Sequence, residues 1–122
     1  MIELPVLQIG ADVDRATFDD VLAEFGSYDW IVFTSANGVR HFFDALFEVN
    51  DDIRMLGMIR IAAVGEGTAN HLRALHLRID LQPKTATADA LAQALVDTGG
   101  IENSKILVIT GNLNADTLWK KL

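Results

Sequence analysis

The sequence of 122 residues has no cysteine, only two prolines and a single tyrosine. The absence of cysteine excludes disulfides, thiolate metal sites and cysteine nucleophiles, and it is typical of a reducing cytoplasm. No apolar run approaches the roughly 18 residues of a membrane span, and no basic segment followed by an apolar one marks a secretory signal. We therefore expect a cytoplasmic protein that does not enter a membrane.

Positive charge is also scarce, with 10 Lys and Arg against 17 Asp and Glu and a formal net charge of −7. The imbalance is concentrated in residues 1–58, which hold eleven acids and three bases, whereas residues 59–122 hold six acids and seven bases. This distribution argues against non-specific binding to nucleic acid or to an anionic membrane, and it counts mildly against a polyanionic ligand. Half of the residues are hydrophobic and 22% are charged, which indicates one folded domain.

Short apolar runs rich in β-branched residues alternate with stretches of helical spacing. We expect strands over residues 2–9, 30–34, 59–64, 78–81 and 105–110. We expect helices over residues 17–25, 35–49, 67–77, 87–96 and 114–122, with Gly26 ending the first. This alternation predicts an α/β fold, an open parallel sheet with helices on both faces of the flavodoxin-like kind. Pro5 suits an edge or connecting strand, because proline donates no bond to a sheet.

Ligands of open α/β sheets bind outside the carboxyl ends of the strands, so the loops after those ends are the candidate site. These loops are residues 34–38, 65–68, 82–87 and 110–112, and all are rich in hydroxyls, small residues or glycine. Each leads into an expected helix, whose free N–H groups and positive dipole end would receive carboxylates or phosphates. The alternative is structural: Ser35 and Thr87 would be ordinary N-caps, and the glycines would only permit tight turns.

Other functional motifs are absent. The pair Gly65 and Gly67 lacks the third small residue of a dinucleotide fingerprint, because Asn70 stands there, and no acid follows about 20 residues later. No phosphate-binding Walker sequence is present. The three histidines do not have the spacing of a metal pair, and the paired acids at 19–20 and 51–52 are expected to be surface residues.

Several segments resemble one enzyme family. Residues 28–39 (YDWIVFTSANGV) resemble the characteristic segment of uroporphyrinogen-III synthase. Weaker matches in the same order and spacing are residues 2–6, 61–69, 85–91, 106–112 and 116–118. The resemblance extends over nearly the whole chain.

The resemblance implies a two-domain enzyme with its active site in the cleft between the domains. Residues 1–10 would be the strand that links the domains, residues 11–122 would be one α/β domain, and the second domain would be missing. The implied reaction cyclises hydroxymethylbilane to uroporphyrinogen III and inverts ring D, without cofactor or metal. Water leaves the hydroxymethyl carbon, and a spiro intermediate follows the cationic azafulvene. We expect this chain to fold but to have little or no activity alone, and an open edge strand at 2–9 favours self-association.

By position in the family pattern, the residues implied to bind substrate are Thr34, Ser35, Asn37, Gly38, Gly65, Gly67, Thr68, Thr85, Thr87, Gly111 and Asn112. No catalytic residue is assigned, because the one tyrosine, Tyr28, precedes a strand and would lie at the wrong end of the sheet. One alternative reading is a non-catalytic α/β module that binds a small anion or a protein at the same edge. A receiver-like or nucleotide-binding domain is disfavoured by the missing motifs.

Overall fold

The structure is a computed structural model, and it describes residues 6–8, 15–49, 56–57, 59–85, 87–98 and 104–110. The strands of its sheet are β1 (Val6–Gln8), β2 (Trp30–Phe33), β3 (Arg60–Ala63) and β4 (Ile106–Thr110). The helices of the described part are α1 (Arg15–Ala23), α2 (Ala36–Val49), α3 (Glu66–Ala74) and α4 (Ala88–Asp97), with a 3₁₀ turn, η1, over Phe25–Ser27. The strands lie in the order β1-β4-β2-β3, and every neighbouring pair is parallel.

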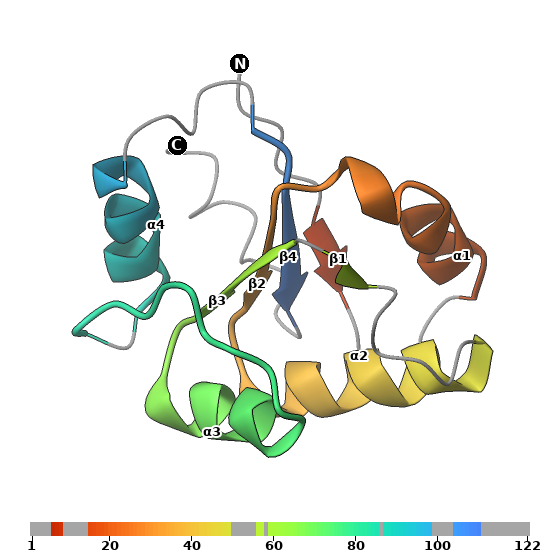
Figure 1. The fold of residues 1–122 in the computed structure, drawn as a ribbon, viewed down its shortest axis with the longest axis horizontal. Helices are drawn as coiled ribbons and strands as arrows, with labels where there is room; N and C mark the ends of the chain where they lie inside the picture. The colour runs from red at the N-terminus through yellow and green to blue at the C-terminus, as the bar shows by residue number, and fades with distance from the viewer. Residues whose placement is uncertain are drawn as a thin grey trace.

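This arrangement confirms the predicted α/β fold with an open parallel sheet (Figure 1). β1 lies at an edge of the sheet, as expected for the strand that follows Pro5. Most of the expected linker strand and all of the expected helix over residues 114–122 lie outside the described residues. Within the described residues, no helix has the length and apolar character that crossing a bilayer requires.

Helices cover both faces of the sheet because successive strand residues point to opposite sides. In β2, Ile31 and Phe33 belong to a core shared with α1, α2 and α3, whereas Trp30 and Val32 belong to a second core shared with α4. β4 divides in the same way, with Leu107 and Ile109 on the first side and Ile106 and Val108 on the second. All residues of β2 and β4 are buried, which explains their continuous apolar sequences.

The larger core is built around the aromatic side chains of α2. The ring of Phe42 lies 5.7 Å from that of Phe18, 5.6 Å from that of Phe33 and 5.2 Å from that of Phe43. These pairs meet edge to face, the geometry that aromatic quadrupoles favour. The apolar face of this helix is therefore buried, except that Phe47 near its end is 37% exposed.

Three expected elements differ in extent, and one of them is α3, which ends at Ala74 instead of residue 77. The strand expected over residues 78–81 is a single parallel bridge between Leu81 and Ala62, because the Asp80 carboxylate accepts the N–H of Ile61 at 2.8 Å in place of a backbone carbonyl. The first helix ends at Ala23 instead of continuing to Phe25. Gly26 therefore lies inside η1 and does not cap α1.

The C-terminus of α3 ends in a left-handed residue that is not glycine. His76 has φ of 64°, and its N–H donates to the Arg73 carbonyl, while the N–H of Leu77 donates to the Leu72 carbonyl. These two bonds form a Schellman motif, in which glycine is the usual residue at the left-handed position. A side chain at this position costs conformational energy that glycine avoids.

At the opposite edge, where the strands begin, Lys105 lies against η1 and the two residues that flank it. Its ammonium lies 3.0 Å from the Glu24 carboxylate, 3.1 Å from the Ser27 hydroxyl and 4.8 Å from the centre of the Tyr28 ring. Burial raises the pKa of Tyr28 above its ordinary value of 10.0, Lys105 lowers this pKa and Glu24 raises it. Tyr28 is thus a buried, neutral phenol far along the strands from the helix starts at the other edge.

Replacing His76 with glycine is predicted to raise the free energy of unfolding by about 1 kcal/mol, because the left-handed conformation then carries no Cβ penalty. His76→Ala is the matched control, since alanine keeps the Cβ and should give no such gain. Urea denaturation measures both variants. Equal stability of the glycine and alanine variants would contradict the strain assigned to this residue.

Because Tyr28 is the only tyrosine, alkaline absorbance reports its ionisation alone. We predict a midpoint above 10.0 in the folded chain, and a further upward shift in Lys105→Met because the nearby positive charge is lost. The unfolded phenol ionises near its ordinary value, so stability falls as pH rises above about 10. Lys84→Met, at an exposed lysine elsewhere, should leave the midpoint unchanged, and a fall in the midpoint of Lys105→Met would refute the assignment.

Candidate functional site at the carboxyl ends of the strands

The carboxyl ends of the strands are level with one another because of their register. Phe33, the last residue of β2, pairs with Ala63 of β3 on one side and with Ile109 of β4 on the other. Leu81 pairs with Ala62, so the segment that follows it leaves the sheet at the same edge. We call this edge the carboxyl rim and define it as residues 34–38, 64–68, 82–85, 87 and 110. In Figure 1, β4 points toward the region in which α2 and α3 begin.

The start of α2 uses its two hydroxyls for structure. The Ser35 hydroxyl accepts the Gly38 N–H at 3.0 Å, which is an N-cap bond, and the Thr34 hydroxyl and N–H both donate to the Ile109 carbonyl at 3.2 Å. The structural reading of Ser35 is therefore confirmed. The amides of Ala36 and Asn37 donate to no acceptor among the described residues, so they remain available at the rim.

Gly38 is needed for close packing in the first turn of α2. A Cβ at this position would lie 3.2 Å from the Ser35 hydroxyl and 3.7 Å from the Ile109 side chain. Any larger residue would disturb the cap or push the helix away from β4. This glycine therefore supports the geometry of the rim, and it is buried rather than presented to a ligand.

The start of α3 has the largest group of free donors. The amides of Glu66, Gly67 and Thr68 donate to no acceptor in the described part of the chain, and the first helical bond begins at Ala69. Thr68 is only 5% exposed, and its hydroxyl has no hydrogen-bond partner among those residues. Buried hydroxyls are normally paired, so this one is the clearest polar group without a structural role.

The glycines of this turn do not need to be glycine for conformational reasons. Gly65 is extended, with φ of −127°, a conformation that any residue adopts, and an added Cβ at Gly67 would meet nothing within 4 Å. The tight-turn reading is therefore not supported for either residue.

The start of α4 is capped by Thr87, whose hydroxyl accepts the Ala90 N–H at 3.1 Å. Its own N–H donates to the Thr85 carbonyl at 2.8 Å, and the Thr85 side chain is exposed. Thr87 is therefore committed to a cap, as the structural alternative predicted. Gly111 and Asn112 lie outside the described residues.

Three residues of this region were not predicted to take part in the site: Glu66, Arg73 and Gln82. Glu66 begins α3, and its carboxylate receives one bond from Arg73 at 3.0 Å and one from Gln82 at 2.9 Å. These partners lie 7 and 16 residues away, and no short motif connects them. Glu66 is the acidic residue of the described rim and Lys84 is the basic one. Only one feature of the sequence could have indicated a role for Glu66, namely its position in the first turn of α3, because acidic residues are favoured at helix N-termini.

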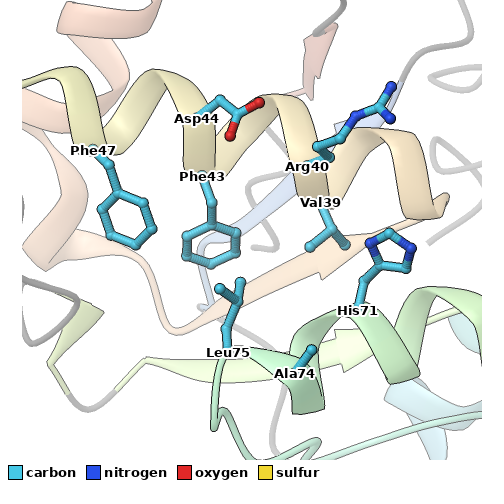
Figure 2. Close-up of a pocket in the computed structure, with 8 residues that line it drawn as sticks. All are labelled: Val39, Arg40, Phe43, Asp44, Phe47, His71, Ala74 and Leu75. Carbon is cyan, nitrogen blue, oxygen red and sulfur yellow. The ribbon is translucent and has the colours of Figure 1, made fainter.

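A pocket of about 230 Å³ lies elsewhere, between the flanks of α2 and α3 (Figure 2). Its walls are Val39, Arg40, Phe43, Asp44, Phe47, His71, Ala74 and Leu75. None of the predicted site residues lines it, and its surface is mainly apolar. Figure 2 shows Arg40 and His71 at one end of the pocket and Phe47 at the other. Within the described residues, no group of three or more His, Cys, Asp or Glu could hold a metal ion.

Comparisons with known proteins identify the family of this chain. The profile of the uroporphyrinogen-III synthase HemD family matches residues 1–122. The chain therefore belongs to the uroporphyrinogen-III synthase family. It is 28% identical over 117 residues to a porphyrin biosynthesis protein HemD from Ruminiclostridium josui, a match that covers 96% of this chain and 23% of that protein.

A second relative is a protein of Methanocaldococcus jannaschii that is provisionally named a uroporphyrinogen-III synthase. The two are 30% identical over 109 residues, which covers 82% of this chain and 45% of that protein. The chain thus spans less than half the length of these two relatives. No solved structure gives a significant match.

Three of the threonine and serine hydroxyls of the rim should respond differently to removal. Ser35→Ala and Thr87→Ala are each predicted to lower the free energy of unfolding by about 1 kcal/mol, because each removes a helix cap. Thr68→Val should leave stability unchanged or raise it by up to about 1 kcal/mol, because it removes a buried hydroxyl that has no partner. Urea denaturation of the three variants checks this, and a Thr68→Val variant that loses more than about 1 kcal/mol would show a structural role.

Proposed function

We propose that this chain forms one wall of the substrate cleft of a uroporphyrinogen-III synthase, which cyclises hydroxymethylbilane to uroporphyrinogen III and inverts ring D. Family membership supports the reaction, and the carboxyl rim supports the location of the site. The observation that carries the proposal is the set of free amides at the starts of α2 and α3, with the unpaired hydroxyl of Thr68 beside them.

The chemistry of the proposed substrate fits these donors. Hydroxymethylbilane is a flexible polycarboxylate, and the atoms that react are already present in it. The enzyme must therefore mainly hold the molecule in one folded shape, which is catalysis by positioning. Helix N-termini bind carboxylates through N–H groups and the helix dipole, without requiring lysines. This explains how an acidic chain could bind an acidic substrate.

In this proposal, the Thr68 hydroxyl and the amides of residues 66–68 hold one carboxylate group, and the amides of Ala36 and Asn37 hold another. Ser35, Thr34, Gly38 and Thr87 act by fixing the backbone that presents these amides. Tyr28 takes no part, because it is buried at the opposite edge of the sheet beside Lys105.

We further propose that a second domain supplies the other wall, with residues 1–10 as the connecting strand. The proposal is supported by relatives that are more than twice as long as the matched segment. The 122-residue chain is accordingly expected to bind tetrapyrrole carboxylates while turning over little or no substrate.

The proposal predicts that Thr68→Val weakens binding of a stable porphyrin analogue of uroporphyrinogen III about tenfold, because a hydrogen bond to a charged group is lost. Titration calorimetry on the 122-residue chain measures the dissociation constants. Ser27→Ala is the control, since it removes a hydroxyl at the opposite edge and should change affinity less than twofold. A folded wild-type chain without saturable binding, or a Thr68→Val variant that binds as wild type does, would contradict the proposed site.

A further inference from the structure

Glu66 presents a difficulty for any anion site at the start of α3. Its side chain belongs to the same turn whose amides, at residues 66–68, are free. A carboxylate at this position would repel an acidic ligand, and it could also accept bonds from these N–H groups, as acidic residues at helix starts do. A ligand carboxylate would then compete with a group that is covalently attached to the site.

The structure shows where this carboxylate is instead. Its Oε1 accepts a bond from the guanidinium of Arg73 at 3.0 Å, and its Oε2 accepts one from the side-chain amide of Gln82 at 2.9 Å. Arg73 also donates to the Asn70 side chain at 3.1 Å, which fixes the guanidinium along the flank of α3. Both oxygens of Glu66 are therefore directed to side chains, and no described backbone amide donates to them.

The hydrogen bond from Gln82 and the bond and charge of Arg73 lower the pKa of Glu66 and thus favour its ionised form. Its negative charge is compensated by Arg73. The Glu66 and Arg73 side chains are 67% and 50% exposed, and exposed ion pairs contribute little to folding stability. The exposed position of this ion pair agrees with a role in keeping the amides of residues 66–68 accessible.

We propose that Arg73 and Gln82 are positioning residues that hold Glu66 on the flank of α3 and so keep the amides of residues 66–68 open to a ligand carboxylate. The inference rests on the proposed function. It implies that the affinity of this site for acidic ligands depends on Arg73. Gln82 also connects the segment after Leu81 to the start of α3, so two turns of the carboxyl rim are held at a fixed spacing.

The test is a double-mutant cycle with the same porphyrin analogue and the 122-residue chain. We expect Arg73→Ala to weaken binding about tenfold, because Glu66 is released toward the amides and its charge is no longer compensated. Glu66→Gln alone should change affinity less than threefold. The double variant should return to within about threefold of wild type, because the competing charge is gone.

A matched control uses Asp89, an exposed acid in the first turn of α4 with no partner among the described residues. Asp89→Asn removes the same charge near the rim, but it should not restore binding to Arg73→Ala. Thermal unfolding of each variant confirms that it is folded. Gln82→Ala should weaken binding by a smaller factor than Arg73→Ala, and the same Glu66→Gln change should restore it.

The outcomes separate the two proposals. If the wild-type chain does not bind the analogue, the proposed function fails and the inference fails with it. If the wild type binds and Thr68→Val weakens binding, but Arg73→Ala has the same effect with and without Glu66→Gln, the proposed function stands and the inference is wrong. Restoration by Asp89→Asn would also overturn the inference, because Arg73 would then act only through general electrostatic attraction.

Discussion

The register in which β2 pairs with its neighbours determines most of this structure. β2 contacts β3 on one side and β4 on the other, with Phe33 opposite both Ala63 and Ile109. The same register places odd-numbered residues of β2 and β4 in one core and even-numbered residues in the other. A shift of this pairing by one residue would move each set of side chains to the opposite face of the sheet and destroy both cores. Burial of these side chains therefore fixes where the strands end relative to one another. The carboxyl rim is therefore a consequence of core packing.

Periodicity alone was sufficient for the elements that bury a complete face. The continuous apolar run of β2 and the spacing of Val39, Phe42 and Leu46 in α2 predicted these elements to within one or two residues. It failed for the strand expected over residues 78–81, where the Asp80 carboxylate replaces a backbone acceptor of the sheet. Whether the Asp80 side chain or a backbone carbonyl accepts the N–H of Ile61 depends on the position of β3, and the local sequence does not specify that position.

The candidate site was predictable in its position but not in the roles of its residues. The loops after β2 and β3 were located correctly, and capping by Ser35 and Thr87 follows from residue type. The hydroxyl of Thr34 could equally have faced a ligand, and only the approach of β4 turns it to the Ile109 carbonyl. The contact between Glu66 and Gln82 likewise depends on tertiary packing across 16 residues.

The double donation from Thr34 to Ile109 has a thermodynamic consequence. It joins the ends of two strands immediately before the first turn of α2, so that turn is ordered as soon as the sheet has formed. Association usually incurs an entropic penalty when loops become ordered around a ligand. For this turn the penalty is already incurred during folding, and the amides that follow Thr34 are preorganised before any ligand arrives.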